Sequence, residues 1–592
     1  MNKALVYIAL ALAAVGCSGG SVANGPLWLA AGEPELKGEP YYELRILDHW
    51  DNLDDSVERG YAGKSIWEWT ADEIPTERIN EYGRLNQSIG INGSVLNNVN
   101  ANPHILDAEH IERVGQIADI LRNYGIKTYL SINFATPLAL GELPTADPLD
   151  EEVAQWWKDK ADEIYTRIPD FGGFLVKASS EGQPGPQDFG RSHVDGANML
   201  ADALAPHGGI VMWRAFVYAS TSPDRANQAV EEFKPFDGQF RDNVIIQIKN
   251  GPVDFQAREP FSPLFGQLKS TPTMPELQIT QEYLGQSFHL AYLGTMWEEF
   301  FNDVRQYARL DSKAIAGVAN TGQEDTWCGH IFSQANWYAF GRLAWDPTLS
   351  AEQIADEWIH LSFPRPAGCS KARFEKKFVE PVKAMMLESR EAVVNYTMPL
   401  GFHHLFNGSH YGPGPWQRSI RPDWSPVYYH KADSLGVGFD RTVATGSGNI
   451  GQYNEPLASR FENIETCPEN LILWFHHVPW DYTMSSGRTL WDEICLHYEN
   501  GIKSVQGFLK TWDSVKEFVD EDTWNKVQDR LVIQEADARW WRDACVQYFQ
   551  TFSGRPVPED VQAPEIPLDS LYRMPGNPPV LQADAGLEAS SF

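Results

Sequence analysis

Between residues 42 and 320 the chain alternates short apolar segments with longer segments that have helical periodicity. This alternation constrains the fold because strands buried on both faces appear as continuous apolar runs, and because parallel strands need a long crossover between them. The predicted strands are eight, at residues 42–50, 88–96, 127–134, 172–178, 209–217, 244–250, 276–283 and 314–320.

The intervening segments at residues 107–124, 150–168 and 193–205 are amphipathic at the helical period. Asp107 and Asp150 precede the first apolar-periodic residues, as N-caps do, while Gly125 and Pro169 end the first two helices. Strand and helix alternating over about 280 residues predict an α/β chain with a (β/α)8 TIM barrel. An open doubly wound sheet remains the alternative, because a reversal of strand order is not visible in a sequence.

The pattern changes after about residue 330, where helical segments dominate. They lie at residues 330–345, 350–363, 372–395, 486–500, 515–518 and 523–552, with a loop-rich section at 401–426. We therefore predict a barrel over residues 41–365 and a mainly α-helical C-terminal domain over residues 366–592. Its Pro-rich tail begins at Ser553, and we expect part of it to lose order beyond Leu571.

The amino terminus resembles an export signal. Lys3 precedes an apolar run at residues 4–15, which is too short to span a membrane, and Cys17 follows as in a bacterial lipobox. We expect a signal peptide over residues 1–17, a lipid on Cys17 and a flexible tether over residues 18–40. The protein would then be exported from a bacterium and be periplasmic or anchored in the outer membrane, with free secretion as the alternative.

The net charge of −32 disfavours nucleic acid as a partner. An anionic small substrate remains compatible with this charge if a local cluster of cations overrides the field of the whole protein. The cysteines other than Cys17 show no CxxC spacing, so we predict neither a metal site nor a disulfide framework.

In a barrel of this class the functional residues gather where the strands end. The predicted strand ends carry one aromatic, three cationic and three acidic side chains: Trp50, Lys177, Glu181, Arg214, Lys249, Asp254 and Glu282. Cations could hold an anionic substrate, and a guanidinium suits a carboxylate in particular. Carboxylates around a sugar suit glycoside hydrolysis, although spacing alone does not separate a glycosidase from a sugar-acid aldolase or lyase.

Histidines are concentrated in the second half of the chain, at His403, His404, His410, His476 and His477. They lack the i,i+4 spacing of a helical metal-ligand pair, so we interpret them as residues of aromatic-rich loops. No cofactor is predicted.

Long motifs around the strand ends resemble the α-glucuronidases of glycoside hydrolase family 67. They are DHWDNLD at residues 48–54, ERGYAG at 58–63, LNNVNAN at 96–102, VKASSEGQPGP at 176–186, MWRAF at 212–216, IKNGP at 248–252, QITQEY at 278–283, QANWYAFGRLAW at 334–345 and WFHHVPW at 474–480. The resemblance covers roughly residues 42–550.

The resemblance implies a (β/α)8 barrel with a helical C-terminal domain, usually in a homodimer. It implies an inverting enzyme that removes glucuronic acid, or its 4-O-methyl ether, α-1,2-linked to xylose in xylo-oligosaccharides from xylan. Glu181 would be the general acid, and Asp254 with Glu282 the pair that activates water. Lys177, Arg214 and Lys249 would clamp the uronic carboxylate, and Trp50 would be a sugar-facing wall.

One feature departs from the family, which normally has an N-terminal α/β domain ahead of the barrel. About 24 residues separate Cys17 from the first predicted strand, so the sequence predicts that this domain is lacking. The alternative function is a non-catalytic, surface glycan-binding lipoprotein derived from such an enzyme.

Overall fold

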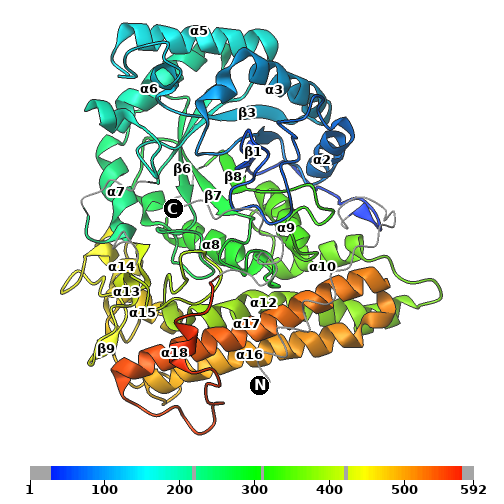
Figure 1. Cartoon of the computed structure of the whole chain (residues 1–592), viewed down its shortest axis with the longest axis vertical. Coiled ribbons are helices and arrows are strands. Elements are labelled where there is room, and N and C mark those ends of the chain that lie inside the picture. Colours follow the sequence, from blue (N-terminus) through cyan, green and yellow to red (C-terminus); the bar gives the residue numbers. More distant parts are fainter. Residues whose placement is uncertain (1–28, 217–221, 309–311, 419–423, 577–592) are drawn as a thin grey trace.

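The computed structural model describes residues 29–216, 222–308, 312–418 and 424–576, and its first half is a closed parallel barrel (Figure 1). Its strands follow one another around the barrel in chain order. They are β1 (Leu44–Asp48), β2 (Gly93–Val95), β3 (Lys127–Ile132), β4 (Gly173–Val176), β5 (Ile210–Arg214), β6 (Val244–Lys249), β7 (Thr273–Gln278) and β8 (Ala314–Val318). The predicted (β/α)8 barrel is confirmed, and the open doubly wound sheet is wrong because β1 pairs with β8.

Apolar side chains fill the barrel interior, as they must where strands are buried on both faces. Ile46, Leu175, Met212 and Met274 belong to this inner cluster, and Trp50 packs with it near the carboxyl end. The outer ring consists of α2 (Thr76–Ser88), α3 (Ala108–Leu121), α5 (Glu151–Arg167), α6 (His193–Leu204), α7 (Gln228–Phe233), α8 (Gly294–Tyr307) and α9 (Ser333–Trp345), with the short α4 (Thr136–Ala139).

The two predicted N-caps occupy the expected positions but differ in what their side chains do. Asp150 accepts hydrogen bonds from the backbone N–H groups of Glu152 and Val153 and so caps α5. Asp107 precedes α3 without a side-chain cap, and its carboxylate instead contacts His104 Nδ1 at 2.8 Å.

Two strands, β2 and β7, differ most from their predicted bounds. Strand β2 begins only at Gly93 because α2 runs to Ser88 and Gly90, at φ +82°, turns the chain between them. Strand β7 covers Thr273–Gln278 and contains Pro275, a residue that normally indicates the edge of a strand. Residues 279–283 form a buried turn instead, so Glu282 lies on a loop beyond β7.

The C-terminal region is mainly helical, as predicted, and packs below the barrel (Figure 1). Its helices are α10 (Ala351–Ser362), α11 (Lys371–Phe374), α12 (Glu380–Thr397), α13 (Pro426–His430), α14 (Leu457–Glu462), α15 (Ile472–Phe475), α16 (Leu490–Ser514), α17 (Glu521–Ser553) and α18 (Leu568–Leu571), with a small sheet of β9 (Gly436–Val437) and β10 (Val478–Pro479). Helix α16 continues past the predicted end at residue 500, because Gly501 allows close contact with α12: a Cβ there would lie 2.8 Å from the Tyr396 amide nitrogen.

The tail and the amino terminus complete the chain. Residues 572–576 pack against the loop around Trp416, and the rest of the tail beyond Leu571, where part of the order was expected to be lost, lies outside the described residues. Cys17, the predicted signal peptide and residues 18–28 of the predicted tether lie outside the described residues. Among the residues that the structure describes, no helix combines the length and apolarity needed to cross a membrane.

Candidate active site

The residues predicted at strand ends lie around the carboxyl mouth of the barrel, because in a closed parallel barrel all strands end at the same face. Lys177 follows β4 directly, while Arg214 and Lys249 are the last residues of β5 and β6. Trp50 comes two residues after β1, and the Arg214 guanidinium lies 5.8 Å from the centre of its ring.

On the β4 side, the Lys177 ammonium contacts the Glu181 carboxylate and donates a hydrogen bond to Asn100 Oδ1 at 2.8 Å. The Lys177 side chain is 2% exposed, whereas that of Glu181 is 36% exposed. Burial is the main influence that lowers the pKa of Lys177, and nearby Arg214 lowers this pKa further, against the opposing charge of Glu181. Glu181 lies at φ +49° in a tight turn that Ser180 and Gln183 close by mutual backbone hydrogen bonds.

Arg214 forms a buried bidentate pair with Glu276 of β7, with Nε–Oε2 and Nη2–Oε1 distances of 3.0 and 2.6 Å. Beside this pair, Asp48 accepts a hydrogen bond from Gln247 Nε2 at 2.6 Å. Burial, together with the neighbouring charge of Glu276, raises the pKa of Asp48 to about 8. The barrel interior therefore places an extended polar network directly beneath the mouth.

On the β6 side, Lys249 Nζ lies 2.6 Å from Asp254 Oδ1, and the Tyr283 hydroxyl donates to Asp254 Oδ2. Burial would raise the pKa of Asp254, but the positive charges of Lys249 and Arg225 outweigh it and hold this pKa well below its usual range. Glu259 shapes the loop, since its carboxylate accepts from the backbone N–H groups of Val253 and Asp254 at 2.9 Å each. Asp254 is therefore kept ionised in a fixed position.

Glu282 is held from three directions. Arg59 Nε and His410 Nδ1 lie 2.9 and 2.7 Å from its Oε1, and Gln278 Nε2 donates to Oε2 at 3.0 Å. Burial acts to raise the pKa of Glu282, yet Arg59 and His410 together lower it below the ordinary range. The charge of Asp254 opposes this lowering. Tyr283, which donates to Asp254, stacks on His410. Because His410 contacts Glu282, the two carboxylates are neighbours linked through these two rings.

Each of the three predicted clamp cations already has a carboxylate partner: Lys177 has Glu181, Arg214 has Glu276 and Lys249 has Asp254. The structure thus brings all seven predicted site residues to the mouth but pairs the cations internally. Two neighbouring ionised carboxylates can accept a proton from water, and the more exposed Glu181 can deliver one.

Several contributors to the site were not predicted, namely Arg59, Asn100, Glu276, Tyr283 and His410. Arg59, Asn100 and Tyr283 lie inside the motifs ERGYAG, LNNVNAN and QITQEY, which were the available signal. His410 gave no such signal, because it reaches Glu282 from a loop of the C-terminal region 128 residues away in the chain.

The other histidines singled out in the sequence bond to protein groups. His403 and His404 contact Glu259 and Gln256, while the His476 and His477 rings contact backbone carbonyls. Within the described ranges no three His, Cys, Asp or Glu side chains come together as metal ligands would.

Comparison with known proteins assigns the family. The model "Glycosyl hydrolase family 67 middle domain" matches residues 31–327, and "Glycosyl hydrolase family 67 C-terminus" matches residues 328–562. The chain is 43% identical over 557 residues to "Alpha-glucuronidase A" of Emericella nidulans, covering 88% of this chain and 64% of that protein. It is 42% identical over 540 residues to "Probable alpha-glucuronidase A" of Neosartorya fischeri, covering 87% and 63%.

The chain therefore spans less than two thirds of the length of these relatives. Among solved structures, an O-GlcNAc hydrolase mutant from Thermobaculum terrenum aligns with a TM-score of 0.38 at 9% identity, over 87% of this chain and 86% of that one, a likeness too remote to support an argument. The two family models together span most of the chain, and the protein belongs to glycosyl hydrolase family 67.

Proposed function

We propose that this protein is an inverting α-glucuronidase that releases glucuronic acid, or its 4-O-methyl ether, from α-1,2 linkages to xylose in xylo-oligosaccharides. The observation that carries the proposal is the pair of buried, neighbouring carboxylates Asp254 and Glu282, both with lowered pKa values. The names of the relatives, which are α-glucuronidases, support the same activity.

The proposed reaction uses Glu181 on one side and the pair on the other. Glu181 follows β4, whereas Asp254 and Glu282 follow β6 and β7, so the acid lies two and three strands around the barrel from them. Glu181 gives its proton to the glycosidic oxygen as the C1–O bond breaks. A water molecule loses a proton to the Asp254–Glu282 pair and bonds to C1 from the opposite face, which converts the α-linkage into β-glucuronic acid.

Lys177, Arg214 and Lys249 are proposed to bind the uronic carboxylate, with Trp50 as a wall of the sugar site. The internal pairing of Lys177 adds a consequence, because a substrate carboxylate that binds Lys177 competes with Glu181 for it. Glu181 would then be released to carry the proton that the leaving xylose needs. Binding of the acidic sugar and release of Glu181 for proton donation would be coupled in this way.

The experiment is an assay for free glucuronic acid after incubation with aldouronic acids, which are xylo-oligosaccharides bearing one glucuronosyl group. Release by the parent protein, lost in Glu181→Ala, supports the proposal. Tight binding of the same oligosaccharides without release by the parent would contradict it and favour the non-catalytic glycan-binding alternative. The assay on 4-O-methylated and unmethylated substrates also gives the preference between them.

Export with a lipid on Cys17 is also proposed, on the basis of Lys3, the apolar run and the residues before Cys17. Metabolic labelling with a radioactive fatty acid in a bacterial host tests it. The parent should be labelled and sediment with membranes, and Cys17→Ser should lose the label. An unlabelled parent protein would contradict the proposal. A homodimer is proposed from the family resemblance alone, and sedimentation equilibrium would test it.

A further inference from the structure

His410 lies in a short loop, residues 407–412, that holds it in an unusual backbone conformation. Its φ is +64°, in the left-handed region that favours glycine. The His410 N–H donates to the Asn407 carbonyl at 3.0 Å, and the Asn407 N–H donates to the Gly412 carbonyl at 2.9 Å. The ring stacks on Tyr283 with centroids 4.8 Å apart while Nδ1 contacts Glu282. Because left-handed backbone is unfavourable for histidine, surrounding contacts must maintain this conformation.

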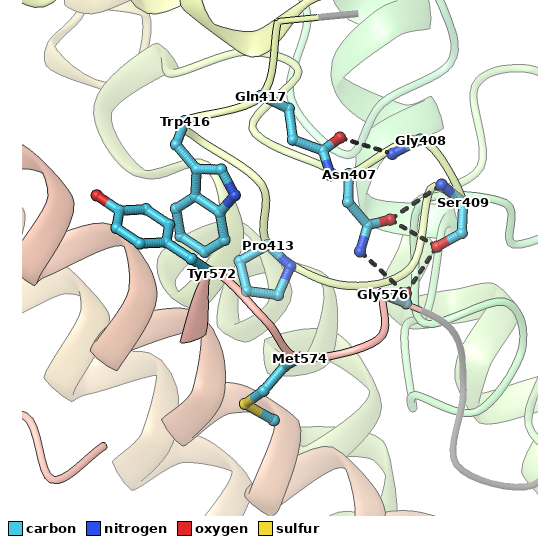
Figure 2. A pocket seen from close by; sticks show the side chains of 9 residues that line it. All are labelled: Asn407, Gly408, Ser409, Pro413, Trp416, Gln417, Tyr572, Met574 and Gly576. Atoms are coloured by element: carbon cyan, nitrogen blue, oxygen red, sulfur yellow. Dashed lines mark hydrogen bonds between the residues drawn. The ribbon is translucent and has the colours of Figure 1, made fainter. Parts of the chain in front are cut away.

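The carbonyl of Gly576, near the end of the described chain, supplies several of these contacts (Figure 2). It accepts hydrogen bonds from Asn407 Nδ2 at 3.0 Å, from Ser409 Oγ at 2.7 Å and from the Gly412 N–H at 3.2 Å. The other end of the Asn407 amide accepts from the Ser409 N–H at 3.0 Å. Residues on both sides of His410 are therefore tied to one oxygen, and we call this arrangement the Gly576 clasp.

The segment that carries Gly576 is itself anchored to the helical domain. Asp543 of α17 accepts from the backbone N–H groups of Glu565 and Ile566 at 2.9 Å each. Leu571 is buried beside Trp540, and the Tyr572 ring meets Trp416 edge-on at 4.7 Å. The segment that carries Gly576 is thus anchored to α17 and to the loop around Trp416.

The hollow beside the clasp has a polar lining whose groups bond to one another. Gln417 Oε1 accepts from the Gly408 N–H at 3.0 Å, and the Asn407 amide is engaged at both ends. Polar groups that bond to one another in this way are typical of a contact that fixes a loop. A ligand site, by contrast, presents its polar groups toward the ligand.

We propose that Asn407, Ser409 and Gly576 are positioning residues for the reaction: the clasp holds His410 against Glu282 and so keeps that carboxylate ionised and correctly placed. This inference rests on the proposed function of Glu282 as part of the water-activating pair. It gives the carboxy-terminal segment, residues 565–576, a role in catalysis that operates through His410.

Gly576→Ala tests the clasp with one methyl group, because a Cβ at residue 576 would lie 1.9 Å from Asn407 Nδ2 and force the two apart. Without His410 in place the pKa of Glu282 should rise, so the acid limb of the kcat/KM profile should move up by about one pH unit. We expect kcat near neutral pH to fall about tenfold while KM changes less than about twofold. His410→Ala should show the same shift, and the double variant should add nothing to it.

The matched control is Gly408→Ala, which adds the same methyl group to the same loop at a place where no atom lies within 4 Å. It should leave the pH profile unchanged, and it would weaken activity if the hollow bound substrate. Thermal melting of each variant identifies any that do not fold, and Asn407→Ala provides a second disruption of the clasp.

An independent readout separates this inference from the proposed function. The His410 imidazole NMR signals, assigned by their loss in His410→Ala, should change their chemical shifts in Gly576→Ala and not in Gly408→Ala. If the parent releases no glucuronic acid, the proposed function fails while the NMR comparison still tests the clasp. Unchanged His410 signals in Gly576→Ala, or a further shift of the acid limb when Gly576→Ala is added to His410→Ala, would overturn the clasp.

Discussion

The barrel mouth has an acid side, which carries Glu181, the proposed general acid, and a base side, which carries Asp254 and Glu282, the proposed water-activating pair. The two sides are built differently. The side chain of Glu181 is 36% exposed on a tight turn, whereas those of Asp254 and Glu282 are 9% and 5% exposed. A general acid must regain a proton from solvent in every turnover, which exposure permits. Groups that take a proton from water must stay ionised, and buried carboxylates do so only with cations and hydrogen bonds around them.

The two sides also differ in where their supports come from. The contacts of Glu181 and Lys177 given above are with residues of the barrel. Those of Glu282 include His410, and the loop carrying Asp254 is fixed by Glu259, which in turn contacts His403. The C-terminal region therefore supports the base side through His410 and His403. If Asp254 and Glu282 activate water as proposed, damage to the packing of this region should reduce that activation.

The largest expected effects come from variants of the two sides, compared on two substrates whose leaving groups differ in their need for protonation. Glu181→Ala should reduce kcat on aldouronic acids by about 10²–10⁴-fold, yet should retain activity on α-D-glucuronosyl fluoride, whose leaving fluoride needs little protonation. Asp254→Asn should lose activity on both substrates, because both require an activated water molecule. The measurement is steady-state kinetics of both variants on both substrates. If both variants lost activity equally on the fluoride, the two sides would not differ in function as proposed.

A smaller effect concerns Lys177, the cation of the acid side. Lys177→Met should lower kcat/KM on aldouronic acids by about 10–100-fold, since a charge-assisted hydrogen bond to the uronic carboxylate is lost. On a glucosyl analogue, which lacks that carboxylate, the variant should be no worse than the parent. The measurement is the ratio of kcat/KM on the two substrates. An equal fold-loss of kcat/KM on both would show that Lys177 does not recognise the carboxylate.

The smallest effect is a pH shift on the base side. Arg59→Gln removes a charge that offsets the burial of Glu282, so the pKa of Glu282 should rise toward and above its ordinary value. Activity needs this carboxylate ionised, and the acid limb of kcat/KM should therefore move to higher pH by about one unit. Arg78→Gln, which breaks an ion pair with Glu81 on α2, is the control and should not shift the limb.

The sequence predicted the barrel well because the alternation of apolar runs and amphipathic helices is a local signal that repeats along the chain. It also predicted which residues reach the mouth, since strand ends converge in any such barrel. It misplaced β7, which was predicted at residues 276–283 and covers Thr273–Gln278, with Pro275 inside the strand. The pairing of Arg214 with Glu276 was missed because Glu276 belongs to a different strand, and no spacing reveals which partners a buried charge will find.

His410 shows the limit of sequence reasoning most clearly. It was interpreted as one of several loop histidines. In the structure it contacts Glu282 from a loop whose Asn407 bonds to Gly576, more than 160 residues away in the chain. Long-range contacts of this kind arise from the packing of the helical region on the barrel and leave no periodicity in the chain.

The central claim is that water attacks from the side of Asp254 and Glu282 while Glu181 protonates the opposite side of the linkage. Proton NMR of the reaction in its first minutes tests this directly, because the anomers of free glucuronic acid are resolved before they equilibrate. The account predicts that β-glucuronic acid appears first from the α-linked substrate. Initial release of the α-anomer would contradict it.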